Sequence, residues 1–374
     1  MSDTVIFEER TTASGHRLGI AMLNAEKSLN ALTLDMIRQL AKQLANWEHD
    51  NKVVAVLLRG AGEKAFCAGG DVRMLRQALR DNCQYPNPLV TTFFSEEYAL
   101  DYHIHTYRKP LIVWGSGIVM GGGLGLMAGA SHRVVTASTR IAMPEITIGL
   151  YPDVAASWFL QRMPAHMGLF LGLTGAPLNA HDALLCNLAD HLASADGWDN
   201  MLQQLASRHW SEDAENNRAS ITALLNELEI EARNTLPDSN VARHLLTVHR
   251  LLNRGTLSAV ANALTHEYFT DPWLVNAAQT FANGSPTSAA ITWEAFQRAR
   301  HLSLAEVFRM ELTLSVNVCN KPDFSEGVRA LLVDKDRNPR WVRPTLQEVD
   351  QDWLNSHFIS PWPVDAHPLA ALAE

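Results

Sequence analysis

Between residues 17 and 136, short apolar runs alternate with stretches of helical periodicity. The runs over 17–23, 53–58, 111–114 and 133–136 have the length and the bounding polar residues of β-strands. The run 53–58 is apolar at every position, which is typical of a strand in a sheet that is covered on both faces. Strands that alternate with helices predict an α/β architecture built from βα units.

The strongest helical pattern of this region follows Thr33, whose hydroxyl is a suitable N-cap. One face of that helix would carry Leu34, Ile37, Leu40, Leu44 and Trp47. After about residue 205, helical patterns dominate, over 220–232, 241–252 and 257–268, and a capping box at 303–306 predicts a further helix. We therefore expect a core over 1–205 and a mainly helical C-terminal region over 206–374.

The composition narrows the class of protein. The 374 residues are 47% hydrophobic, which is enough for a large core. A formal net charge of -9 disfavours a dedicated binder of nucleic acid or of anionic membranes. Four scattered cysteines without a C-x-x-C pair indicate reduced thiols rather than a disulfide framework or a zinc site. The first residues lack a secretory pattern, so we expect a soluble, cytoplasmic protein.

Two glycine-rich turns each follow a predicted strand, KAFCAGGDVR with Ala68 and Gly70, and GIVMGGGLGL with Gly122. Successive N–H groups at such turns can point at one oxygen, so two facing turns would stabilise an oxyanion. Alternatively, the glycines only permit close packing of strand and helix, and the pattern leaves both interpretations open. No P-loop is present, and the acidic residue of a dinucleotide-binding motif is missing.

Glu145 and Asp153 are the only carboxylates between residues 102 and 181. Each follows a proline in apolar surroundings. A carboxylate in such a setting is either paired with a cation, for which Arg140 and Arg162 are candidates, or has a pKa suited to proton transfer. The sequence leaves these two interpretations open as well.

Taken together, these segments resemble the crotonase (enoyl-CoA hydratase/isomerase) superfamily, and within it the 3-hydroxyisobutyryl-CoA hydrolase branch. The resemblance runs through LGIAMLNAEKSLNALT, KAFCAGGDVR, FFSEEY, GIVMGGGLGL and AMPEITIGLYPDV. It continues in FANGSPTS and FSEGVRALLVDKDRNPRW, a tail that generic hydratases lack. The implied fold is a spiral of ββα units that forms two roughly perpendicular sheets, followed by a helical C-terminal region.

The resemblance implies a site for acyl-CoA. The backbone N–H groups of Gly70 and Gly122 would form the oxyanion hole for the thioester oxygen. The stretch around Ala68 would line the path of the adenine and pantetheine groups, with Lys27 near the phosphates.

The resemblance also assigns roles to carboxylates. Glu97, in FFSEEY, matches a position that contacts substrate in the hydrolase branch, and Glu145 and Asp153 match the catalytic acids of that branch. A typical hydratase holds its water between two glutamates, but the first of these positions is Gly125 here, which favours attack at a carbonyl carbon over hydration. The alanines that follow Asp153, beginning with Ala155, stand where glycines are usual. Their larger side chains would reshape the acyl pocket.

The implied reaction is hydrolysis of a short β-hydroxyacyl-CoA thioester, most simply 3-hydroxyisobutyryl-CoA in valine catabolism. It requires neither a metal ion nor a redox cofactor, because an oxyanion hole and carboxylates suffice for acyl transfer, and coenzyme A is part of the substrate. Two alternatives are an enoyl-CoA hydratase/isomerase and a non-catalytic CoA-binding scaffold on the same fold. We expect no nucleic-acid or membrane partner, and the sequence leaves open whether the chain forms a homo-oligomer, as crotonases often do.

Overall fold

The computed structural model describes residues 3–373. The chain forms two compact units whose segments alternate along the sequence. The first unit comprises the chain up to Gly70, Leu100–Ile141 and Leu178–Ala242. The second comprises Asp71–Ala99, Ala142–Pro177 and the chain from Arg243. The two units alternate along the sequence and do not meet at a single boundary near residue 205. The division into a core over 1–205 and a helical region over 206–374 stays a prediction.

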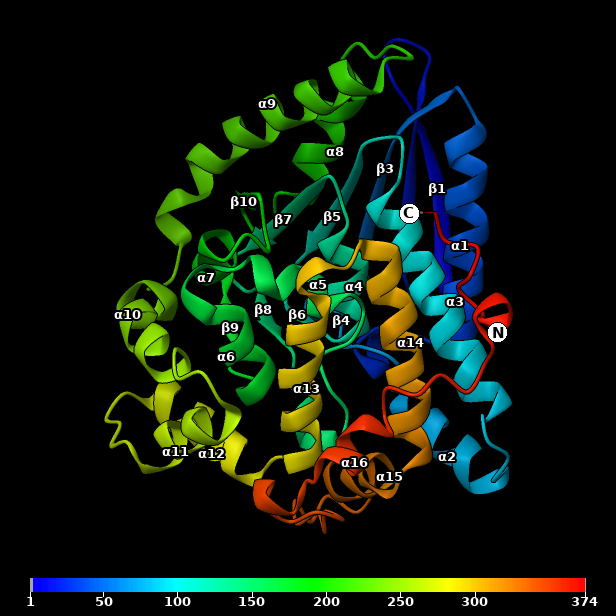
Figure 1. Cartoon of the computed structure of the whole chain (residues 1–374). Coiled ribbons are helices and arrows are strands. Elements are labelled where there is room, and N and C mark those ends of the chain that lie inside the picture. The colour runs from blue at the N-terminus through cyan, green and yellow to red at the C-terminus, as the bar shows by residue number, and fades with distance from the viewer. Residues whose placement is uncertain (1–2, 374) are drawn as a thin grey trace. The chain divides into compact units, whose positions relative to one another are not determined.

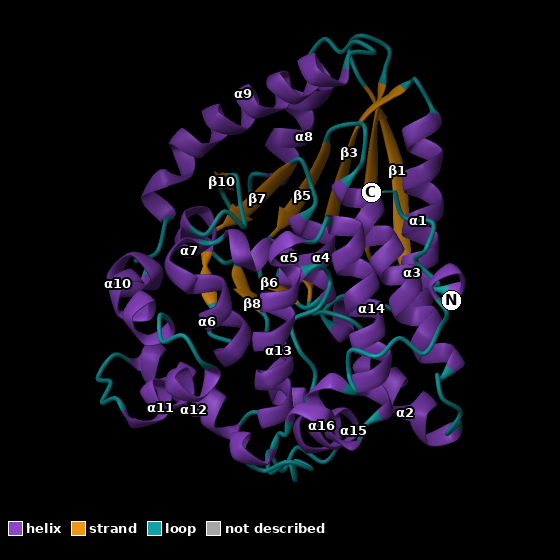
Figure 2. Cartoon of the chain, in the orientation of Figure 1, coloured by secondary structure: helices purple, strands orange, loops and turns teal. Residues whose placement is uncertain are grey.

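Two sheets form the framework of the first unit (Figure 2). The six-stranded sheet has the order β1 (Val5–Thr11), β2 (Arg17–Leu23), β3 (Val53–Gly60), β5 (Leu111–Gly115), β7 (His132–Thr136) and β10 (His191–Ala193). In this sheet β1 is antiparallel to β2, and the strands from β2 to β10 pair in parallel. The four-stranded sheet has the order β4 (Ala65–Cys67), β6 (Ile118–Met120), β8 (Arg140–Ala142) and β9 (Leu178–Asn179).

Helices cover the larger sheet. The helices of the first unit are α1 (Leu34–His49), α4 (Gly122–Ala128), α7 (Ala180–Leu185), α8 (Trp198–Ser207) and α9 (Ala214–Ala232). Apolar side chains of α8 and α9 share a buried cluster with Leu18, Ala55 and Ile112 of the central strands, as their positions beside the sheet in Figure 1 indicate. The first six residues of β3 are buried, as its all-apolar sequence predicts.

The second unit consists mainly of helices (Figure 1). They are α2 (Val72–Asp81), α5 (Ala156–Phe159), α6 (Met167–Thr174), α11 (Leu257–His266), α12 (Pro272–Asn283), α13 (Pro286–Arg298), α14 (Leu304–Asn320), α15 (Pro322–Val328) and α16 (Gln351–Asn355). Helices α3 (Pro88–His105) and α10 (Asn240–Leu252) each run from one unit into the other. The buried stripe of α14 includes one carboxylate, Glu311, among apolar and small polar residues.

Most of the predicted elements are present. The strand over 17–23 has the expected bounds, Thr33 caps α1 by accepting the Met36 N–H, and the capping box of α14 is formed. The edge strand β1 is absent from our sequence predictions, because its charged, largely exposed positions hide the alternation that marks a half-buried strand. Within residues 3–373, no helix is long and apolar enough to cross a membrane.

Candidate active site

The two glycine turns lie against each other in the first unit. A methyl group added at Gly69 would lie 3.3 Å from the Met120 carbonyl oxygen and 3.7 Å from the Gly122 nitrogen. Helix α4 begins at Gly122, and the N–H groups of a helix's first turn have no acceptor within the helix. The arrangement therefore provides the facing turns that an oxyanion hole needs, while the binding of an oxyanion stays a prediction.

The backbone at these turns shows why glycine is required. Gly69 has φ of +101°, and the N-cap Gly121 has φ 48° and ψ -125°, a combination that side chains disfavour. The Leu32 N–H donates to the Gly69 carbonyl oxygen at 2.8 Å, so the trans peptide directs the Gly70 N–H away from Leu32. A methyl group at Gly123 would collide with the Cys67 carbonyl oxygen. Close packing therefore accounts for Gly123, while donor placement at Gly70 and Gly122 stays a prediction.

The segment expected to line the coenzyme A path is joined to the loop that carries Lys27. The Ala68 N–H donates to the Leu29 carbonyl oxygen at 3.1 Å. Lys27 is exposed on the short 3-10 helix Glu26–Ser28, with its ammonium group free to meet an anion from solvent. The roles of Ala68 and Lys27 toward coenzyme A stay predictions.

Three predicted carboxylic acids, Glu97, Glu145 and Asp153, are buried in the second unit, and we call them the carboxyl cluster. Their exposed fractions are 2%, 5% and 5%. Glu97 projects from α3, Glu145 begins the 3-10 helix Glu145–Ile148 directly after Pro144, and Asp153 follows Pro152. The fixed φ of each proline restricts the backbone just before the acidic residue.

The cluster is not neutralised by arginine. Within residues 3–373, neither Glu145 nor Asp153 forms an ion pair. Arg162 instead places its guanidinium 3.4 Å from the centre of the Trp158 ring, and Arg140 is exposed in β8. Of the two interpretations that the sequence left open, the structure favours carboxyl groups with shifted pKa values.

Burial sets the proton affinity of each carboxyl group. Burial, together with the charge of Asp153, raises the pKa of Glu145 and of Glu97 well above the ordinary glutamate value. Burial also raises the pKa of Asp153, to about 6, while a hydrogen bond from Tyr98 opposes the rise. The charge of an ionised Asp153 therefore increases the proton affinity of both glutamates.

Two oxygens of the cluster lack a protein partner. Glu97 Oε1 and Glu145 Oε2 are buried, and no group among the described residues forms a hydrogen bond with either. Buried polar atoms are nearly always hydrogen-bonded in folded proteins. These two oxygens are consequently the best placed to meet a water molecule or a polar group of a substrate.

Sequence reasoning missed the groups that surround Asp153. The Tyr98 hydroxyl donates to Asp153 Oδ2 at 2.7 Å, and Ser315 Oγ lies 2.6 Å from Tyr98 Oη and 2.9 Å from Tyr151 Oη. The Tyr151 hydroxyl donates to the Glu311 carbonyl oxygen at 2.7 Å. A signal was present in the sequence, because Tyr98 follows Glu97 and Glu311 interrupts an apolar helical stripe.

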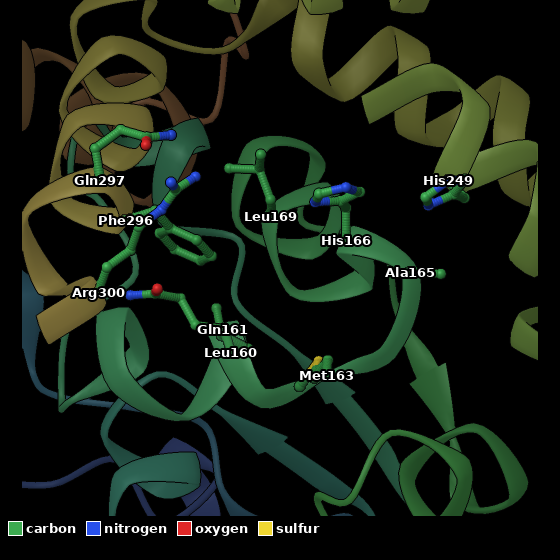
Figure 3. A pocket seen from close by; sticks show the side chains of 10 residues that line it. All are labelled: Leu160, Gln161, Met163, Ala165, His166, Leu169, His249, Phe296, Gln297 and Arg300. Carbon is green, nitrogen blue, oxygen red and sulfur yellow. The ribbon is translucent and has the colours of Figure 1, made fainter. Parts of the chain in front are cut away.

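A surface pocket of about 400 Å³ in the second unit is separate from these residues (Figure 3). In it His166 and His249 face each other with ring centres 5.4 Å apart, while Arg300 and Phe296 extend from α13 and the turn after it. The lining contains no carboxylate and none of the residues of the carboxyl cluster.

Comparison with known proteins finds similarity to one family over most of the chain. The family model described as enoyl-CoA hydratase/isomerase matches residues 18–358. A relative from Danio rerio named 3-hydroxyisobutyryl-CoA hydrolase, mitochondrial, is 37% identical, with 92% of this chain and 87% of the relative covered. The human protein of the same name is 35% identical, with 91% of this chain and 86% of the relative covered.

Solved structures show the same fold. A structure described as a carnitinyl-CoA dehydratase from Mycobacterium thermoresistibile is 33% identical and matches with a TM-score of 0.84 over 99% of each chain. An enoyl-CoA hydratase from Rhodobacter sphaeroides is 28% identical and has a TM-score of 0.81, over 96% of this chain and 98% of that chain. These matches confirm the predicted α/β fold with its helical C-terminal region.

The comparisons also correct one expectation. The scattered cysteines and the first residues of the sequence predict a cytoplasmic protein. The curated relatives from Danio rerio and from human are both named as mitochondrial proteins. The cytoplasmic expectation is therefore wrong, because the features on which it rested do not distinguish between these compartments.

Proposed function

The chain belongs to the enoyl-CoA hydratase/isomerase family, and on this premise we propose that it hydrolyses the thioester of 3-hydroxyisobutyryl-CoA. The products are 3-hydroxyisobutyrate and coenzyme A, a step of valine catabolism. The names and the extensive coverage of the curated relatives support this substrate. The observation that carries the proposal is the buried carboxyl cluster, which has no cation beside it among the described residues. Two of its oxygens, Glu97 Oε1 and Glu145 Oε2, form no hydrogen bond with a described residue.

We assign the reaction steps as follows. A nucleophile attacks the thioester carbonyl carbon, and the Gly70 and Gly122 N–H groups stabilise the resulting oxyanion. Preorganised donors of this kind contribute about 3 to 4 kcal/mol each to the stability of the transition state. Collapse of the tetrahedral intermediate breaks the carbon–sulfur bond and expels the coenzyme A thiolate, which takes up a proton.

Glu145 activates the attack. Its raised pKa makes its carboxylate form a stronger base than that of an exposed glutamate. It either removes a proton from water or attacks the carbonyl itself and forms an anhydride that water then hydrolyses. Glu97 binds the β-hydroxyl group of the substrate through its unpartnered oxygen. Asp153, as a carboxylate, positions the water or this hydroxyl. It assists release of the thiolate by accepting the proton that the attacking water gives up and passing it to the sulfur.

Substitution of Glu145 by glutamine tests the assignment. We expect thiol release from 3-hydroxyisobutyryl-CoA to fall by about 10²- to 10⁴-fold, because the base is lost. Binding of the ester, measured by calorimetry, should be retained since the volume of the side chain is unchanged. Turnover at the wild-type rate would remove Glu145 from the mechanism.

Hydration of an enoyl-CoA is the second candidate, because both solved structures described above bear dehydratase or hydratase names. Gly125 argues against it, since this buried position of α4 carries no proton-transfer group. Loss of enoyl absorbance from crotonyl-CoA, measured beside thiol release, separates the two activities. Enoyl loss without thiol release would favour the hydratase.

We propose that the reaction needs no metal ion or redox cofactor. Backbone donors and carboxyl groups provide the electrophilic stabilisation and the proton transfers that acyl transfer requires. We further propose that the chain acts without a nucleic-acid or membrane partner. Its association into a homo-oligomer is a separate proposal, which sedimentation of the purified protein tests directly.

A further inference from the structure

The turn that follows Asp153 is strained. Val154 and Ala155 have φ values of +54° and +66°. The left-handed region disfavours residues with a Cβ, and β-branched residues such as valine most strongly. Two consecutive residues in this region keep their conformation only where surrounding contacts hold them.

One buried side chain from a distant part of the sequence holds this turn. Glu311 of α14, which is fully buried, accepts a hydrogen bond from the Ala155 N–H at 2.6 Å through Oε2. Its other oxygen, Oε1, accepts one from the Ser157 N–H at 3.0 Å. Both bonds satisfy N–H groups at the start of α5 that have no acceptor within that short helix.

The same face of α14 also reaches the Asp153 side chain. Ser315 follows Glu311 by four residues and therefore lies on the same face of the helix. Its hydroxyl contacts the Tyr98 hydroxyl, which donates to Asp153 Oδ2. Helix α14 thus constrains Asp153 in two ways. Glu311 holds the main chain just after it, and Ser315 contacts the tyrosine, Tyr98, that is hydrogen-bonded to its carboxylate.

We propose that Glu311 is a positioning residue for the hydrolysis, holding the strained turn so that the Asp153 carboxylate keeps its alignment. This inference rests on the proposed function, because it takes Asp153 as a participant in the reaction. A residue that served stability alone would change the melting temperature, whereas a positioning residue changes the turnover number of the folded enzyme.

Substitution of Glu311 by glutamine tests this proposal. Glutamine has nearly the same volume but places an NH₂ donor against one of the two backbone N–H groups. We expect kcat for 3-hydroxyisobutyryl-CoA to fall by about 100-fold, as misplacement of a reacting group by about 1 Å does, with KM changed less than about twofold. Adding Ala155→Gly should restore much of kcat, because glycine adopts a positive φ without strain.

Asp182 provides a matched control in the first unit. It is buried and accepts backbone N–H groups from Asn179 at 3.1 Å and from Val241 at 2.9 Å. Asp182→Asn should lower the melting temperature and leave kcat of the folded protein unchanged. Equal effects of Glu311→Gln and Asp182→Asn on kcat would overturn the positioning role.

Two further variants keep the proposal testable. If Glu311→Gln does not fold, Glu311→Asp retains the carboxyl group on a shorter side chain, and kcat should fall by about 10-fold with KM retained. Wild-type kcat in Glu311→Asp would contradict the proposal. If Asp153→Asn retains full activity, the proposed function has the wrong role for Asp153. If Asp153→Asn is inactive while the Glu311 variants are active, only the positioning role fails.

Discussion

Replacing Tyr98 by phenylalanine removes one hydroxyl group beside the carboxyl cluster and leaves the ring in place. The ring is fully buried and packs against Phe94 and Phe308 at centroid distances of 5.7 and 5.8 Å, contacts that phenylalanine preserves. Ser315 loses one partner but keeps its contact with Tyr151 at 2.9 Å. The perturbation is therefore confined to the two contacts of the Tyr98 hydroxyl, with Asp153 and with Ser315.

The size of the effect follows from that bond. The Tyr98 hydroxyl donates to the ionised carboxylate at 2.7 Å and thereby lowers the pKa of Asp153, which is nevertheless raised to about 6 by burial. A hydrogen bond to a charged group contributes about 1.5 to 3 kcal/mol. Since one pKa unit corresponds to about 1.4 kcal/mol, loss of the bond should raise the pKa of Asp153 by about 1 to 2 units.

The assay is thiol release from 3-hydroxyisobutyryl-CoA between about pH 5 and about pH 9, with kcat/KM plotted against pH, because this ratio reports ionisations of the free enzyme. If the carboxylate form of Asp153 is active, its protonation lowers wild-type activity as the pH drops through about 6, in addition to the loss caused by protonation of Glu145, which is the same in both enzymes. In Tyr98→Phe the same fall should occur about 1 to 2 pH units higher. At higher pH the kcat/KM values of the two enzymes should converge.

Tyr151→Phe is the matched control, because it also removes a buried phenol hydroxyl that contacts Ser315. The Tyr151 hydroxyl donates its proton to the Glu311 carbonyl oxygen and not to Asp153. Its acid limb should stay at the wild-type position. An unchanged acid limb in Tyr98→Phe, or an equal displacement in both variants, would refute the assignment of this ionisation to Asp153.

Three further predictions concern the glycine turns, the reaction route and the absence of a metal. Gly123→Ala should lower the free energy of unfolding by about 1 to 3 kcal/mol in denaturant melts, because the added methyl collides with the Cys67 carbonyl oxygen. A melt like that of the wild type would show that α4 can move away. Single-turnover hydrolysis in ¹⁸O-labelled water should place label in the peptide containing Glu145 if water attacks the Glu145 carbonyl carbon of an anhydride. Direct attack of water on the thioester, or attack on the substrate carbonyl of the anhydride, leaves that peptide unlabelled. Dialysis against EDTA should leave thiol release unchanged, and a loss that Mg²⁺ or Zn²⁺ restores would contradict the proposal that no metal is needed.

Local sequence signals predict the elements that place these residues. The all-apolar strand β3 and the capped helices α1 and α14 follow from patterns of neighbouring residues, and the structure confirms them. The motifs also identify Glu145 and Asp153, because prolines and apolar neighbours set them apart in a long stretch without other carboxylates.

Periodicity shows which face of an element is buried, but it does not show which distant segment covers that face. The contact of Glu311 with the turn after Asp153 joins residues more than 150 positions apart. The choice between an ion pair and a shifted pKa at Glu145 likewise depends on burial and on the placement of arginines. Sequence by itself determined the elements and the candidate acids. Only the tertiary structure decided which groups surround Asp153, because desolvation and hydrogen bonding depend on distances between chain segments.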